Sequence, residues 1–198
     1  MTKASRKVAR DFQRQQQKSK SNSATWWIVG IIGAIVVVSA FLVIYLPSRP
    51  VGALDGMQTY NNLAGQHSES AQIYPQNPPA GGVHSAAWLN CGIYDQPVKN
   101  ENAVHSLEHG AVWITYRPDL PQSAVEQLRS LARGRSHVLL SPYPDLPKPV
   151  VASAWGLQLP VDDAADLRLA VFVSRYEQGP QTPEPGAVCS GGVGTPIS

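Results

Sequence analysis

The chain has 198 residues, enough for one domain with appendages rather than for two full domains. Its formal net charge of +2 is unevenly distributed: seven of the 16 Lys and Arg but only one of the 14 acidic residues lie in residues 1–25. That segment therefore carries +6 and the remainder −4. Because the main part of the chain is weakly acidic, we expect no nucleic-acid partner.

Residues 26–46 (WWIVGIIGAIVVVSAFLVIYL) contain no charged side chain. A helix of this length measures about 31 Å, which matches a hydrocarbon core of about 30 Å. Trp26, Trp27 and Tyr45 lie at its ends, where aromatic residues favour the membrane interface. The sequence predicts a transmembrane helix over 26–46. A cleaved signal peptide stays open as an alternative, since residues 51–53 (VGA) resemble a small-residue cleavage site.

The basic residues indicate the orientation of this span. Seven Lys and Arg precede it and only Arg49 lies close behind it, so we expect a cytoplasmic N-terminus and a single-pass protein of the cell membrane, with the lipid bilayer as a partner. The predicted organisation is a cytoplasmic tail (1–25), the span (26–46), a juxtamembrane connector (47–73), an extracytoplasmic domain (74–193) and a flexible C-terminus (194–198).

The second half of the chain predicts an α+β domain, with a small mixed sheet and helices packed on it. Strands are expected at 111–116, 137–141 and 150–155, where β-branched and aromatic residues gather. A helix is expected over 118–134, with Ser123 and Glu126 as a capping box and Gly134 as its stop, and a second helix after Asp162 or Asp163, reaching Tyr176. The same order occurs in the second half of a thioredoxin-like fold, although the chain has no C-x-x-C motif.

Two cysteines, Cys91 and Cys189, lie in the predicted outer domain. An even number of cysteines outside the cytoplasm predicts one disulfide. Cys91 as a thiolate metal ligand is the alternative. The position of Cys189 in a Gly-rich tail favours the disulfide, which would tether that tail.

Three histidines suggest a metal site. His105 and His109 are four residues apart, so a helical turn would place both rings on one face, and His84 could supply a third ligand from the preceding loop. Imidazole ligands suit zinc or copper. Glu108 or Glu101 could orient a ring or act as a fourth ligand.

The other candidate ligands are weaker. His67 and His137 are isolated in the sequence and are expected to be ordinary polar residues. Met57 would serve as a soft ligand only if the metal were copper.

Three interpretations of the histidines remain open. In the first, the outer domain is a non-catalytic metal-binding domain. In the second, the histidines form a polar core in a structural or partner-binding domain of the cell envelope, with Trp88, Tyr94 and Trp155 as its recognition surface. In the third, residues 105–109 (HSLEH) match the H-x-x-E-H pattern of zinc peptidases, with Glu177 as a nominal third ligand. Gly110 would end that helix at once, which counts against the third. The sequence therefore favours a protein without catalytic residues.

Three segments carry a family resemblance: residues 74–84 (YPQNPPAGGVH), 101–110 (ENAVHSLEHG) and 154–156 (AWG). From about residue 74 to about residue 193 the chain resembles the family called domain of unknown function 3105. The resemblance implies a single-span or exported bacterial protein, of actinobacterial type, to which no activity is assigned. It also implies that the three histidines belong to the shared motif and the cysteines to a subset, which favours a stabilising bridge between Cys91 and Cys189.

Overall fold

The computed structural model describes residues 10–14, 27–29, 31–34 and 54–197. The chain divides into two compact units, Met1–Val51 and Gly52–Ser198. The described stretches of the first unit are helical. Within the described part of the chain, no helix combines the length and the apolar character needed to cross a bilayer. Most of the predicted span 26–46 and of the tail 1–25 lies outside the described residues.

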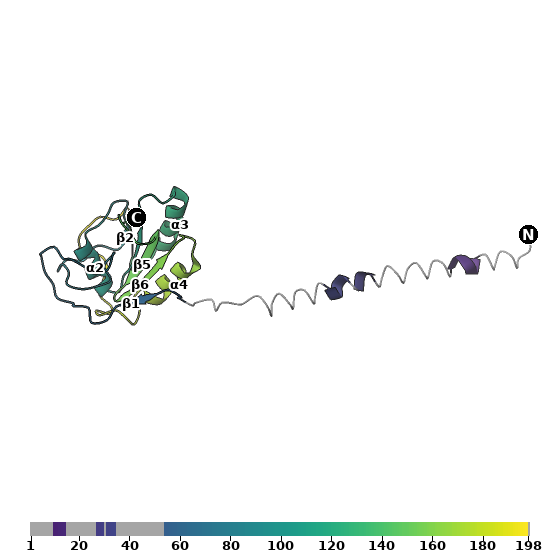
Figure 1. The fold of residues 1–198 in the computed structure, drawn as a ribbon, viewed down its shortest axis with the longest axis horizontal. Coiled ribbons are helices and arrows are strands. Elements are labelled where there is room, and N and C mark those ends of the chain that lie inside the picture. Colours follow the sequence, from purple (N-terminus) through teal and green to yellow (C-terminus); the bar gives the residue numbers. More distant parts are fainter. Residues whose placement is uncertain (1–9, 15–26, 30, 35–53, 198) are drawn as a thin grey trace, which may run out of the picture. The chain divides into compact units, whose positions relative to one another are not determined.

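The second unit contains a mixed six-stranded sheet in the order β1-β6-β5-β3-β4-β2 (Figure 1). Two parallel pairs, β3 with β4 and β4 with β2, lie beside three antiparallel pairs. The strands are β1 (Gln58–Thr59), β2 (Gly92–Ile93), β3 (Val112–Tyr116), β4 (Val138–Pro142), β5 (Val150–Ala154) and β6 (Leu157–Val161), and the helices are α2 (Asn100–Glu108), α3 (Gln122–Ala132) and α4 (Leu167–Tyr176).

Each face of the sheet is covered, because successive side chains of a strand point to opposite faces. Val112 and Ile114 of β3 pack in one cluster with the apolar sides of α3 and α4. Trp113, between them, packs on the other face with Ala103 and Leu107 of α2. Figure 1 shows α2 on one side of the sheet and α3 and α4 on the other. The domain is therefore α+β, as the sequence predicts, and α2 has a layer of its own.

The predicted strands and helices of the second half are present, and one further strand was not expected. β6 follows β5 through a tight turn at Trp155 and Gly156, and Gly156 adopts a left-handed backbone with φ of +72°. The strand was missed because Pro160 interrupts the segment and proline is unusual inside a sheet. In the sheet, Pro160 lies opposite Val151 of β5.

The predicted helix starts need correction. Pro121 stands at the N-cap of α3 without a capping side chain, so the capping box of Ser123 and Glu126 is wrong. Asp166 caps α4, where its carboxylate accepts a hydrogen bond from the Arg168 backbone at 2.9 Å, rather than Asp162 or Asp163. The stop at Gly134 is correct, since this residue has a φ of +73° just past the helix.

The segments predicted as connector and flexible C-terminus both take part in the fold. β1, inside 47–73, pairs with β6 and extends the sheet at one edge. At the other end, the Ile197 backbone donates a hydrogen bond to the Ile93 carbonyl at 2.8 Å. The folded unit thus extends beyond 74–193 in both directions.

Phe172 gives a test of the core on the α3 and α4 side. Its side chain is fully buried, with its ring centroid 4.8 Å from that of Tyr176. We expect Phe172→Ala to lower the free energy of unfolding by about 3–5 kcal/mol, because the truncation leaves a cavity. Equilibrium urea unfolding measures the change. The matched control is Leu167→Ala on the same helix, where 82% exposure predicts a change below about 0.5 kcal/mol; equal losses in the two variants would contradict the assignment.

Candidate metal centre

The Pro/Gly-rich loop 74–83 is fixed against the β5–β6 hairpin and delivers His84. The Gly156 backbone donates to the Ala80 carbonyl at 2.7 Å, and the Gln158 side chain donates to the Pro78 carbonyl at 2.7 Å. The Tyr74 hydroxyl closes the loop by donating a hydrogen bond to the Val83 carbonyl, also at 2.7 Å. His84 follows at once and is 0% exposed.

Backbone pairing brings His67 beside His84. The two residues form an isolated parallel bridge, in which the Ser68 backbone donates to the His84 carbonyl at 2.7 Å and the His84 backbone donates to the Gln66 carbonyl at 3.1 Å. The His67 ring stacks on the His105 ring with 4.9 Å between centroids. The interpretation of His67 as an isolated residue is therefore wrong.

The last turn of α2 supplies the remaining residues of the predicted motif. His105 and Glu108 lie in the helix and His109 is its C-cap. Gly110 ends the helix with a φ of +93°, where a Cβ would lie only 2.9 Å from the Thr182 hydroxyl. A side chain at this position would push away the C-terminal segment, which crosses here. The side chains of His105, Glu108 and His109 are all buried.

Three backbone carbonyls fix the orientation of three imidazole rings. The Nδ1 atoms of His84, His105 and His109 lie 2.8, 2.7 and 2.7 Å from the carbonyls of Gly82, Ser85 and Val188, respectively. A carbonyl oxygen only accepts hydrogen bonds, so each Nδ1 carries the hydrogen. The neutral ring then offers a lone pair at Nε2, which is the arrangement usual for histidine ligands of metals.

The Nε2 lone pairs converge on one another and on carboxylates. His84 Nε2 lies 2.9 Å from Glu108 Oε2, and His105 Nε2 lies 2.9 Å from His109 Nε2. His67 Nε2 is 3.7 Å from the same Glu108 oxygen, and His109 Nε2 is 3.4 Å from Glu184 Oε2. With Nδ1 protonated, the two shortest contacts join acceptor to acceptor. They call for protons or cations between them.

The donor atoms form two overlapping groups. His67, His84, His105 and Glu108 make the first, and His105, His109 and Glu184 make the second; within each, all donor atoms lie within 4.8 Å of one another. We name these the first and the second donor group. Such separations suit a single ion, because bond lengths of about 2.0–2.1 Å place tetrahedral ligand atoms about 3.4 Å apart.

Burial keeps the His105 ring neutral. Desolvation lowers the pKa of His105 below its usual value, and the neighbouring His109 and His84 lower it further, while the Ser85 carbonyl and Glu108 act in the opposite direction. A lowered pKa means that the ring stays unprotonated at neutral pH. Unprotonated imidazole is the form that binds a metal.

Aromatic side chains wall the cluster. The Trp88 ring lies 5.8 Å from His105 and 5.1 Å from His109 between centroids, and Trp155 lies 5.8 Å from His84. Tyr94 is buried and its hydroxyl donates to the Asn90 carbonyl. Of the three aromatics predicted to form a recognition surface, Tyr94 is buried, and Trp88 and Trp155 are half-buried against the histidines.

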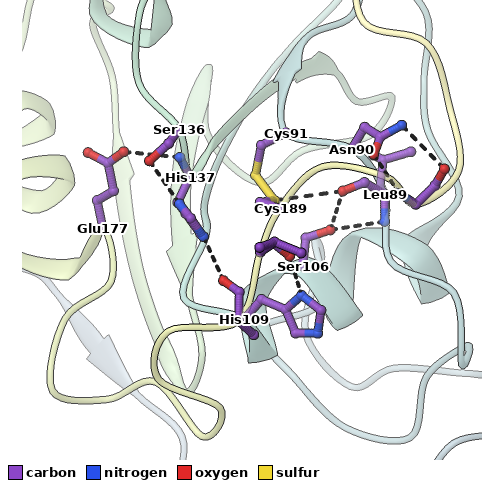
Figure 2. Close-up of a disulfide and its surroundings, with 12 residues drawn as sticks. Leu89, Asn90, Cys91, Ser106, His109, Ser136, His137, Glu177 and Cys189 are labelled. Carbon is purple, nitrogen blue, oxygen red and sulfur yellow. Dashed lines mark hydrogen bonds between the residues drawn. A yellow bond between two sulfur atoms is a disulfide. The ribbon is translucent and has the colours of Figure 1, made fainter.

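The disulfide holds the C-terminal segment over α2 (Figure 2). The sulfur atoms of Cys91 and Cys189 are bonded at 2.01 Å, as the sequence predicts, and Cys91 is therefore not a thiolate ligand. The Cys91 backbone also donates to the Cys189 carbonyl at 2.8 Å. Val188, whose carbonyl orients His109, is the residue just before Cys189. The disulfide therefore helps to fix the Val188 carbonyl, which binds His109 Nδ1.

The match to a family model covers the whole cluster. A model described as Protein of unknown function (DUF3105) matches residues 66–191. The chain belongs to this family. The matched range includes every member of both donor groups and both cysteines of the disulfide. Neither the comparison with curated proteins nor that with solved structures finds a match.

Two predicted ligands lie outside both groups of the DUF3105 domain. The Glu101 carboxylate accepts a hydrogen bond from the Gln72 backbone at 3.0 Å and makes no hydrogen bond to a histidine among the described residues. Met57 packs against the core cluster that covers α3 and α4, whereas the histidines gather around α2.

His137 and Glu177 have structural partners. His137 Nε2 donates to the Ala187 carbonyl at 3.0 Å, which ties down the C-terminal segment (Figure 2). Glu177 pairs with Arg135 at 2.8 Å and accepts from the His137 backbone. The nominal third ligand of the peptidase motif is therefore engaged elsewhere, and His137 is an ordinary polar residue, as expected.

Sequence reasoning missed His67 and Glu184. Neither lies near the histidine motif in the sequence, and Glu184 is 75 positions beyond His109. The one available signal for Glu184 was its place five residues before Cys189, since a predicted disulfide draws that tail toward Cys91. His67 carried no such signal, because only the backbone bridge to His84 positions it.

Proposed function

We propose that this domain binds a divalent transition metal, zinc or copper, through its histidine cluster. The observation that carries the proposal is the convergence of buried lone pairs. His84 Nε2 faces Glu108 Oε2, and His105 Nε2 faces His109 Nε2, each at 2.9 Å, while backbone carbonyls hold every opposite Nδ1 as a donor. A bound cation converts these acceptor pairs from repulsive to attractive.

The donor set favours a borderline metal. Imidazole nitrogens and carboxylates suit zinc, copper and related divalent ions, and neither donor group contains sulfur. The carbonyl partners of Nδ1 give the rings the outer support that metal ligands require. His67, with a side chain 46% exposed, keeps the first donor group in contact with solvent.

A binding role is supported better than a peptidase. In the H-x-x-E-H mechanism Glu108 would activate a water, but here its carboxylate is buried against His84 as a member of the first donor group. The helix also ends at Glu108, and Glu177 pairs with Arg135.

The second part of the proposal is the location of the domain. A membrane span over 26–46, with a cytoplasmic N-terminus, would place the domain outside the cytoplasm. The uncharged 21-residue stretch and the seven preceding basic residues support this orientation. The disulfide supports it too, because such bonds persist in oxidising compartments. Recovery of the intact chain in the soluble fraction, or of the domain on the cytoplasmic side by accessibility labelling, would contradict it.

The topology supports a thioredoxin-like interpretation of the sheet. A β3-α3-β4 unit and a β5-β6-α4 unit share the strand order β6-β5-β3-β4. This is a likeness of fold alone and brings no redox function, since the two cysteines are 98 residues apart and bonded to one another.

Metal analysis of the purified full chain tests the binding proposal. We expect stoichiometric zinc or copper after purification without chelator, and a lower melting temperature after a chelator removes it, because an ion that binds only the native state stabilises that state. A chain that carries no metal, and whose melting temperature does not respond to added Zn²⁺ or Cu²⁺, would instead favour a structural or partner-binding role for the histidines.

A further inference from the structure

Six donor residues meet in this cluster, and they fit two ions better than one. The first and the second donor group have only His105 in common. His109 and Glu184 do not join the first group, in which all donor atoms lie within 4.8 Å. Opposite ligands of one ion are about 4.2 Å apart at bond lengths of about 2.1 Å. Some of the six donor atoms are more than 4.8 Å apart, so the six cannot all bind one ion.

His105 decides how the ligands are shared. Its Nδ1 donates to the Ser85 carbonyl, so Nε2 is its one available lone pair and it binds one ion only. That lone pair lies 2.9 Å from His109 Nε2, a separation that fits adjacent ligands of one ion. With His105 assigned to the second group, each group keeps two histidines and one carboxylate.

The C-terminal segment is fixed so that Glu184 completes the second group. The Glu184 backbone donates to the Glu108 carbonyl at 3.1 Å, and five residues later the disulfide anchors the same segment. Between these points the Val188 carbonyl binds His109 Nδ1. The Glu184 carboxylate lies 3.4 Å from His109 Nε2, with its side chain 53% exposed.

Each ion would then have its own negative charge and its own open face. Glu108 lies in the first group and Glu184 in the second, so two divalent cations do not depend on one carboxylate. Half-exposed side chains, His67 in one group and Glu184 in the other, leave both positions accessible to solvent. Three protein ligands leave coordination positions for water.

We propose that the centre holds two divalent transition-metal ions, one bound by His67, His84 and Glu108 and the other by His105, His109 and Glu184. This inference rests on the proposed function, because both ions use the same histidine cluster. The alternative is a single ion in the first group, with the second group empty.

Zinc stoichiometry of the full chain separates these possibilities. Chelator-treated protein is saturated with Zn²⁺, freed of excess metal by gel filtration and analysed for zinc per chain. We expect two ions in the wild type, one in a Glu184→Gln and His109→Ala double variant, and two in the control Glu126→Gln, an exposed acid on α3. One ion in the wild type overturns the second position and leaves the proposed function standing, whereas no ion overturns both.

A spectroscopic measurement keeps the test independent of folding defects in the variants. Wild-type chain loaded with Cu²⁺ should give an electron paramagnetic resonance spectrum of a coupled pair, because two ions in adjoining donor groups lie close together. The double variant should give the spectrum of an isolated ion. An isolated-ion spectrum from fully loaded wild type overturns the inference.

Discussion

Replacing His84 with glutamine is expected to abolish binding at the first metal position. His84 is fully buried and its Nε2 is 2.9 Å from Glu108. Glutamine can still donate a hydrogen bond to that carboxylate, so the change removes the metal ligand while it leaves the buried charge a partner. Because changes in outer-shell partners alone cost about 10–100-fold in affinity, we expect a loss above about 100-fold here.

The loss should appear in stability as well as in metal content. At an ion concentration 100 times the dissociation constant, the bound ion contributes about 2.7 kcal/mol to the wild type, and this contribution should vanish in His84→Gln. Calorimetric zinc titration and thermal melts with and without zinc measure the two effects. His137→Gln is the matched control: it is also a buried histidine bonded to a carbonyl, but it lies outside both donor groups. Zinc-dependent stabilisation as large in His84→Gln as in the wild type, or an equal loss in the control, would contradict the assignment.

Removal of the disulfide is expected to cost more stability than any surface change. Cys91 and Cys189 are 98 positions apart, and closing a loop of that length stabilises the native state by about 4–5 kcal/mol on the chain-entropy model. We therefore expect Cys91→Ser with Cys189→Ser to lower the free energy of unfolding by about that amount in urea denaturation. A dithiol reductant should have the same effect on the wild type and none on the double variant.

The same variant should weaken the metal centre unequally. Val188 precedes Cys189 and its carbonyl orients His109, so loss of the bridge loosens the second donor group first. The first group is held by the His67–His84 backbone bridge and by the Gly82 carbonyl at His84 Nδ1, neither of which is a bond to the C-terminal segment. Zinc titration of the variant should show a larger loss of affinity at the second donor group than at the first. A stability change below about 1 kcal/mol, or an equal loss at both positions, would contradict this account.

Local patterns predicted most of the elements. The β-branched residues of 111–116 and the apolar stripe of 118–134 correspond to β3 and α3, because alternation and helical spacing both reflect burial against one layer. The predicted helix starts were wrong, because several residues could serve as the N-cap and the sequence did not single out Pro121 or Asp166. β6 was missed because Pro160 argues locally against a strand, whereas its pairing with β5 over the whole segment is a tertiary feature.

The predicted ligand set shows the same division. The four-residue spacing of His105 and His109 and the helix stop at Gly110 are local features, and both were foreseen. His67 and Glu184 were not, since their approach depends on backbone pairing with His84 and with Glu108 across long separations. The contribution of Glu101 was expected from its position on the same helix, but its side chain faces Gln72 instead.

The sequence by itself determined the α+β class, the cysteine pair and the histidine turn. Periodicity and spacing over a few residues predicted the elements and the turn, and the expected oxidising compartment predicted the disulfide. Only the tertiary structure decided which donor atoms lie close together. Ligand atoms must converge to within a few ångströms, and that convergence is set by sheet pairing, by the loop that delivers His84 and by the disulfide that returns the C-terminal segment to α2. Apart from the His105–His109 pair, spacing along the chain does not encode these distances, since they depend on contacts between segments far apart in the sequence.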